Sequence, residues 1–216
     1  MKKLYVSFLF LGLFIGFTLC VWLCDRAPIG PNGSIVGFST LNKWFSSTIG
    51  FNMILYEITD WAGILPVATA IIYGFIGLYQ WIKRKKIKNV DTNILLLGGF
   101  YLLIFAIYML FNYVVINYRP LLINGYLEPS FPSSTTLMSI TFIMLSNYQI
   151  NVYIKNKKAK GILSVLSITF MLFLVVGRII SGVHWITDII ASILLSISIL
   201  FIYQFLCDKC KLKIQV

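Results

Sequence analysis

Residues 94–115 read ILLLGGFYLLIFAIYMLFNYVV, a run without a single charged side chain. A helix of about 20 apolar residues spans a bilayer core of about 30 Å, so this run predicts a transmembrane helix. The whole chain has the same character, because 59% of its 216 residues are hydrophobic and 12% are charged. Such a composition excludes a soluble enzyme and an intrinsically disordered chain.

Five further apolar runs lie on either side of this one. We predict an all-α fold, an integral membrane bundle of six helices in a single domain over residues 1–216. The fourth run looks short from its first apolar residue, Leu137, so its helix is expected to begin in the polar residues 133–136. The expected spans are residues 4–23, 61–82, 94–115, 133–153, 162–180 and 184–206.

A net charge of +11 is common in nucleic-acid-binding proteins, but here the basic residues gather in clusters beside apolar runs. This pattern is typical of cytoplasmic loops. We therefore expect a cell-membrane protein with both termini in the cytoplasm, contact with anionic membrane lipids and no nucleic-acid partner. The loops around Arg119 and His184 are expected outside. The clusters are residues 2–3, 83–88, 155–160 and 209–213.

The first run is expected to be a retained span rather than a cleaved signal peptide. It is longer than the usual apolar core of a signal, and the residues before Cys20 and Cys24 are leucines rather than small residues. The other two cysteines, Cys207 and Cys210, form a lone Cys-x-x-Cys pair, whereas a zinc site would need a second pair of ligands. We expect no metal and no cofactor, and the oligomeric state stays open.

Residues 177–188 read GRIISGVHWITD and contain the only histidine of the chain, His184. On a helix His184 and Asp188 would share a face, so the carboxylate would hold one ring nitrogen and leave the other free as a base or nucleophile. A helix break at residues 181–182 would bring Arg178 to the same membrane surface. Each residue alone is explained as an interfacial or capping side chain. Together they are costly near lipid and indicate a site.

A second polar segment precedes the fourth span. Residues 132–136 read PSSTT, a helix start whose hydroxyl caps and free backbone N–H groups suit an anion. Arg119, held by Pro120 after the third span, adds a planar guanidinium that matches phosphate oxygens. Ordinary capping and a boundary arginine would explain either feature alone. Combined with Arg178 and His184, they indicate a pocket for phosphoryl transfer.

These segments resemble the type 2 phosphatidic acid phosphatase family of integral membrane lipid phosphatases, relatives of the vanadium haloperoxidases. That family carries, in this order, the motifs Lys-x6-Arg-Pro, Pro-Ser-Gly-His and Ser-Arg-x5-His-x3-Asp. Residues 119–120 match the end of the first motif and residues 132–133 the start of the second. Arg178, His184 and Asp188 match the third with its spacing.

The resemblance implies a role for each matching residue. His184 would attack phosphorus to form a phosphohistidine, and Asp188 would orient its ring. A lipid phosphate would be the substrate, and no metal or cofactor would take part. The phosphate would be bound by Arg119, Arg178, Ser133 and Ser134.

Four positions depart from the family pattern. Thr135 stands where the second motif has its general-acid histidine, and a threonine hydroxyl is no acid near neutral pH. The protein is then a weak or inactive relative, uses another outer acid, or acts on a substrate whose leaving group needs little protonation. The candidate acids are Glu128, Glu57 and Asp60. The other departures are Asn112 for the first-motif lysine, Gly177 for serine and Ser134 for glycine.

The leading hypothesis is a phosphatase of the outer membrane face that hydrolyses a lipid phosphate or diphosphate. Polyprenyl diphosphate, such as undecaprenyl diphosphate, is the preferred substrate, because it expels a stable phosphate. The alternative is a non-catalytic relative that binds or transports lipid phosphates. Outside the membrane, residues 27–52 are expected to form a loop and an interfacial helix that inserts Trp44 and Phe45 into lipid, or to pack over the outer mouth.

Overall fold

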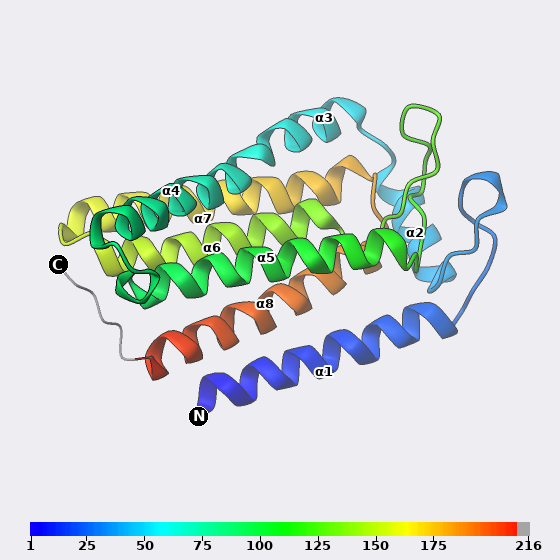
Figure 1. Cartoon of the computed structure of the whole chain (residues 1–216). Helices are drawn as coiled ribbons and strands as arrows, with labels where there is room; N and C mark the ends of the chain where they lie inside the picture. The colour runs from blue at the N-terminus through cyan, green and yellow to red at the C-terminus, as the bar shows by residue number, and fades with distance from the viewer. Residues whose placement is uncertain (211–216) are drawn as a thin grey trace.

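The computed structural model describes residues 1–210, and this part of the chain is helical, without a strand. The long helices lie along one another in a single bundle (Figure 1). The elements are α1 (Lys2–Leu23), η1 (Pro31–Gly33), α2 (Ser39–Ile49), α3 (Met53–Ala62), α4 (Ile64–Arg84), η2 (Ile87–Asn89), α5 (Thr92–Tyr113), α6 (Ser134–Tyr153), α7 (Lys157–Ser181) and α8 (Ile186–Lys209).

Five segments of residues 1–210 are long and apolar enough to cross a membrane, and they correspond to five of the six predicted spans. The all-helical prediction is confirmed, whereas the number of spans stays a prediction, because α6 is not among the five. Two predicted starts are wrong: the second segment begins at Met53, since α3 leads almost directly into α4, and α8 begins after His184. The five segments are Lys2–Leu23, Met53–Arg84, Thr92–Tyr113, Lys157–Ser181 and Ile186–Lys209.

Helix α6 is less apolar because its neighbours bury its polar side chains. It contacts α4, α5, α7 and α8. Gln149 is fully buried and accepts a hydrogen bond from Asn93 at 2.5 Å. Ser146 lies 3.0 Å from the hydroxyl of Tyr101. Polar groups that are satisfied between helices are compatible with a membrane interior, so a central helix does not need the hydropathy of a lipid-facing one.

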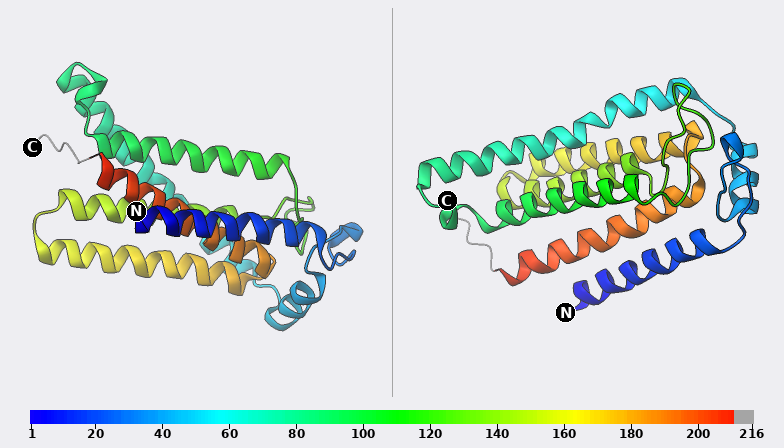
Figure 2. Two further views of the ribbon diagram at one scale, coloured as in Figure 1. Left: turned by 90° about the horizontal axis from the view of Figure 1, so that it is seen from below. Right: turned by 45° about the vertical axis from the view of Figure 1, so that its right-hand side comes forward.

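Aromatic and aliphatic side chains fill the space between the helices. The ring of Phe100 meets Tyr203 edge-on with centroids 5.2 Å apart, and Leu97 beside it is fully buried. α1 runs along α8 in both views of Figure 2. There Ser7 and Ser198 exchange hydrogen bonds with each other's carbonyl at 3.0 Å. Small hydroxyl residues of this kind let two membrane helices approach closely.

The two ends of the bundle differ in composition. The N-terminus, the end of α8, the α4–α5 link and the α6–α7 turn lie at one end, which we call the basic end (Figure 1). There Lys3 pairs with Asp208 at 2.8 Å. The predicted basic clusters therefore share one end, although Lys211 and Lys213 lie outside the described residues. That this end faces the cytoplasm stays a prediction.

A buried carboxylate ties three helices together at the basic end. Asp91, 2% exposed, accepts hydrogen bonds from Arg84 at 2.6 Å, Gln80 at 2.9 Å and Tyr153 at 2.8 Å. Burial opposes the charge of Asp91, but the bonds from Arg84, Tyr153 and Gln80 outweigh it and hold the pKa of this carboxyl below its usual value. The network fixes α4, α5 and α6 relative to one another.

The opposite end, which we call the site end, carries α2, the loop 114–133 and the link 182–185 (Figure 1). The helix expected within residues 27–52 is present as α2, and its location outside the membrane stays a prediction. Its Asn42 is fully buried and donates to the hydroxyl of Thr187 at 3.0 Å, at the start of α8. Trp44 points outward and is 63% exposed. α2 thus packs on the start of α8, and insertion of Trp44 into lipid stays a prediction.

Candidate active site

The link between α7 and α8 places His184 beside Asp188. α7 ends at Ser181, and Gly182 adopts a left-handed conformation with φ of 69°, so the predicted break is confirmed. The prediction that His184 and Asp188 share a helix face is wrong, because His184 precedes α8. Asp188 instead accepts a hydrogen bond from the backbone N–H of Trp185 at 3.0 Å. This capping turn leaves Oδ2 of Asp188 3.5 Å from Nδ1 of His184.

The imidazole of His184 is 4% exposed, and neither of its nitrogens has a hydrogen-bond partner among residues 1–210. Burial lowers the pKa of His184 well below its usual value, and the positive charges of Arg119 and Arg178 lower it further. The ring is therefore neutral at neutral pH. A neutral imidazole is the nucleophilic form.

Arg119 belongs to the loop 114–133, which folds back on itself. Its backbone N–H donates to the carbonyl of Glu128 at 3.0 Å, and its Nε lies 3.0 Å from the Glu128 carboxylate. The indole N–H of Trp185 donates to the carbonyl of Tyr118 at 2.6 Å. The loop is thus attached to the start of α8, which keeps the Arg119 guanidinium near His184.

Arg178 comes from the last turn of α7 and its side chain is fully buried. Its Nη2 lies 2.5 Å from Oδ1 of Asp60 on α3. Within the described residues, its Nε and Nη1 donors have no hydrogen-bond partner. Buried donors are rarely left unpaired in proteins, so these groups are candidates for binding an anion.

The start of α6 lies against the start of α8. Ser133 caps α6: its hydroxyl accepts from the N–H of Thr136, and its own N–H donates to the carbonyl of Asp188 at 3.2 Å. The hydroxyl of Ser192 donates to the carbonyl of Ser133 at 2.9 Å. These bonds place the positive end of the α6 dipole beside the His184 link, where it favours a negatively charged group.

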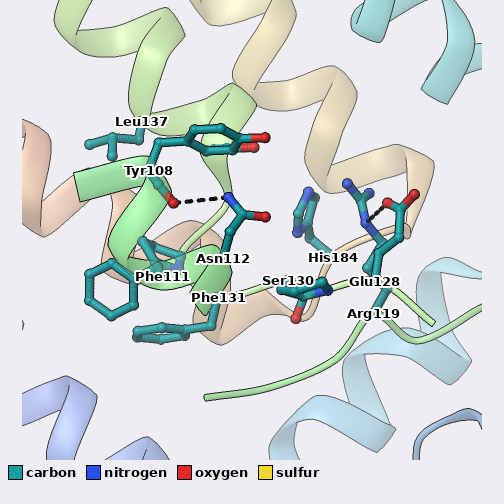
Figure 3. Close-up of a pocket in the computed structure, with 12 residues that line it drawn as sticks. Tyr108, Phe111, Asn112, Arg119, Glu128, Ser130, Phe131, Leu137 and His184 are labelled. Atoms are coloured by element: carbon teal, nitrogen blue, oxygen red, sulfur yellow. Dashed lines mark hydrogen bonds and ion pairs between the residues drawn. The ribbon is translucent and has the colours of Figure 1, made fainter. Parts of the chain in front are cut away.

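These elements enclose a cavity of about 310 Å³, which is within the usual range for a small-ligand site. In the view of Figure 3, the ring of His184 lies between Asn112 on one side and the Arg119–Glu128 pair on the other. Ser134 also lines the cavity. A neutral imidazole, a guanidinium and a helix start at one cavity can bind a phosphate and present a nucleophile to it.

The region that builds most of this cavity, residues 113–209, matches the family model of the PAP2 superfamily. The resemblance inferred from the motifs is confirmed.

A solved structure extends the likeness to nearly the whole chain. The chain is similar to a transmembrane PAP2 type phosphatidylglycerolphosphate phosphatase from Bacillus subtilis, with 18% identity and a TM-score of 0.59 over 97% of this chain and 98% of that chain. At this identity the likeness shows a shared fold. Among the curated proteins, none matches the chain.

The structure brings most of the predicted PAP2 residues together at the site end. His184, Arg119 and Ser134 line the cavity, while Arg178 and Asp188 are buried close to it. Ser133 is fully buried as the cap of α6, and its hydroxyl lies 3.0 Å from that of Thr136. Its expected role in binding phosphate stays a prediction.

Thr135 does not line the cavity of His184. It faces a neighbouring cavity of about 400 Å³, which it shares with Asp60. Successive residues of a helix point about 100° apart, so Thr135 is turned away from the cavity of His184 although Ser134 lines it. Ser134 and Tyr108 line both cavities, which are therefore adjacent.

Asn112 lies in the cavity of His184, at the position where the PAP2 pattern has lysine. Its amide donates to the carbonyl of Tyr108 at 2.9 Å (Figure 3). The cavity therefore lacks the positive charge that the pattern places there. Glu128 lines the same cavity, with a side chain that is 40% exposed.

Sequence reasoning missed the contacts of α3. Asp60 was considered as an acid, but not as the partner of Arg178. Tyr56, whose ring lies near the guanidinium groups of Arg119 and Arg178, was not considered. Tyr56 lies more than 60 residues before Arg119 in the chain. No motif or spacing links such distant positions, so only the packing of α3 reveals them.

Proposed function

We propose that the chain is a membrane lipid phosphatase that works through a phosphohistidine at His184. The superfamily match and the fold it shares with a membrane phosphatase support a phosphatase of lipids. The observation that carries the proposal is a single buried imidazole, kept neutral by burial and two arginines, at a cavity with phosphate-binding groups. Buried polar groups that only stabilise a fold are normally paired, whereas both ring nitrogens of His184 and the Nε and Nη1 atoms of Arg178 have no hydrogen-bond partner in the described part of the chain.

The proposed reaction has two steps. Nδ1 of His184 faces Asp188, so Nε2 is the nitrogen that attacks phosphorus. The bond between phosphorus and the leaving oxygen breaks, and that oxygen keeps the electron pair. Water then attacks the phosphohistidine, the P–N bond breaks, and phosphate leaves with the imidazole restored. Arg119, Arg178 and the start of α6 hold the non-bridging oxygens through both steps.

A lipid diphosphate, with polyprenyl diphosphate preferred, is the proposed substrate. A monophosphate expels an alkoxide, which needs a proton, whereas a diphosphate expels a phosphate that is already stable. Thr135 has no acidic group and lines the neighbouring cavity, so the first reaction lacks a proton donor at that position. The proposal places the reaction at the outer face, in line with the basic clusters at the other end.

Phosphate release by the purified full-length protein in detergent tests the proposal. We expect polyprenyl diphosphate to be hydrolysed about 10²-fold faster than phosphatidylglycerol phosphate, since a positioned acid typically contributes about 10² to 10⁴ in rate. The activity should survive EDTA and be inhibited by vanadate. Equal rates on the two lipids would mean that another acid, such as Glu128, acts; strict dependence on an added divalent metal would contradict the phosphohistidine.

A second candidate is a protein that binds lipid phosphates without hydrolysing them. Two observations favour it: the amide of Asn112 replaces a cation, and Thr135 replaces an acid. Binding of both lipids without phosphate release would support this candidate against the first.

A further inference from the structure

Helix α3 contacts both arginines of the candidate site through one aromatic ring. The Cζ atom of Arg178 lies 4.8 Å from the ring centroid of Tyr56, and that of Arg119 lies 5.7 Å from it. A guanidinium within about 6 Å of such a centroid is attracted by the negative face of the ring. The two cations come from α7 and from the loop after α5, and Tyr56 is a neighbour that they share.

Asp60 follows Tyr56 by one helical turn and therefore lies on the same face of α3. Its Oδ1 is 2.5 Å from Nη2 of Arg178, whose side chain is fully buried, while the Asp60 side chain is 56% exposed. The guanidinium of Arg178 is thus held by a ring and by a carboxylate. Its remaining donors, Nε and Nη1, have no partner in the described part of the chain, so α3 determines where they point.

A glycine allows α3 to reach this position. A Cβ atom added at Gly177 would lie 2.4 Å from Cγ2 of Thr59, whereas the next atoms would be at 3.7 and 3.8 Å. The first distance is a clash and the others are ordinary contacts. The backbone N–H of Asn52 also donates to the carbonyl of Ser181 at 3.0 Å, which attaches the start of α3 to the end of α7.

We propose that Tyr56 and Asp60 are positioning residues for the two phosphate-binding arginines. The absence of a side chain at Gly177 allows α3 to pack close enough to α7 for these contacts to form. The inference deepens the proposed function, on which it rests. It also gives a physical reason for a departure from the family pattern, because a serine at position 177 would displace α3. With an amide at Asn112, Arg119 and Arg178 supply the positive charge of the site, so their placement decides how phosphate binds.

The ring of Tyr56 is tested by replacing it with Leu or with Phe. Tyr56→Leu removes the π face, so we expect the KM for the lipid substrate and the Kd for orthovanadate to rise roughly 10-fold, with a smaller change in kcat. Tyr56→Phe keeps the face and should restore both constants to within about 3-fold. Trp61→Leu is the matched control, because Trp61 lies on the same helix and is 75% exposed. Unchanged constants in Tyr56→Leu would overturn the inference.

The glycine contact is tested by a pair of substitutions. Gly177→Ala should weaken orthovanadate binding, because its methyl group meets Cγ2 of Thr59. Thr59→Ser removes that carbon and leaves neighbours at 3.7 Å or more. The double variant should therefore recover the Kd of the unmodified protein to within about 2-fold. If the double variant binds orthovanadate as weakly as Gly177→Ala, the packing distance of α3 does not determine the position of the arginines, and the inference is overturned.

Orthovanadate binding, measured by calorimetry on the purified protein, separates this inference from the proposed function. Binding that depends on Tyr56, without hydrolysis of any lipid phosphate, would contradict catalysis and support the positioning role. Hydrolysis with a KM and an orthovanadate Kd that do not change when Tyr56 is replaced would support catalysis and contradict the positioning role. A protein that neither binds orthovanadate nor hydrolyses lipid phosphate would contradict both.

Discussion

Buried polar groups at the basic end and at the site end of the bundle differ in how completely they are hydrogen-bonded. At the basic end, Asp91 is 2% exposed and accepts hydrogen bonds from three side chains. At the site end, Arg178 and His184 are as deeply buried, yet Nε and Nη1 of the first and both nitrogens of the second have no hydrogen-bond partner among residues 1–210. Paired buried groups stabilise a fold, whereas unpaired ones cost stability. We therefore interpret the Asp91 cluster as structural and the cluster of Arg178 and His184 as the candidate site.

His184→Ala should produce the largest effect, and it should fall on activity alone. Loss of the nucleophile is expected to lower lipid phosphate turnover by about 10³-fold or more. Thermal stability should stay the same or rise, because the substitution removes a buried polar group without a partner. Phosphate release and a thermal unfolding curve measure the two quantities. Activity that survives would remove His184 from the nucleophile role.

Asp91→Ala should have the opposite profile. It removes the buried acceptor that Arg84, Gln80 and Tyr153 share, which is expected to lower the free energy of unfolding by about 3 to 5 kcal/mol, while the folded protein keeps its turnover. Asp208→Ala is the matched control, since the Lys3–Asp208 pair is exposed and contributes about 1 kcal/mol at most. Equal melting temperatures for the two variants would contradict the structural role of the Asp91 network.

Thr135→His tests whether the site end lacks only a proton donor. The new imidazole is expected to raise turnover of a lipid monophosphate by up to about 10²-fold, and to change diphosphate turnover much less. Both rates are measured on the same variant, so a loss of folded protein lowers them together. Equal gains on the two lipids would contradict the argument from the leaving group.

The charge of His184 gives a subtler test. Because burial and two arginines lower its pKa well below the usual value, the folded ring should remain neutral as the pH falls through about 6.5. The unfolded chain binds a proton there, so stability should decline as the solution is acidified through this range. Labelled histidine gives one NMR resonance, since the chain has one histidine. A titration midpoint near pH 6.5 for this resonance in the folded protein would contradict the buried, neutral ring.

Much of the fold follows from local features of the sequence. Apolar runs predict helices because length and hydropathy are local properties. The interval from Arg178 to Asp188 predicts a site because these two residues and His184 lie within 11 residues of sequence. The helix expected over residues 133–153 is present as α6, and its polar residues are compatible with a membrane because four neighbouring helices bury them. The direction of Thr135 and the approach of Tyr56 depend on how helices pack, which no single segment encodes.

The stereochemistry at phosphorus tests the central claim most directly. A lipid diphosphate analogue whose terminal phosphorus carries sulfur and one heavy oxygen isotope is hydrolysed by the purified protein in water enriched in the third oxygen isotope, and the configuration of the released thiophosphate is determined. Attack by His184 followed by attack of water inverts phosphorus twice, so the account predicts net retention. Net inversion would mean that water attacks the substrate directly, and would contradict the phosphohistidine at His184.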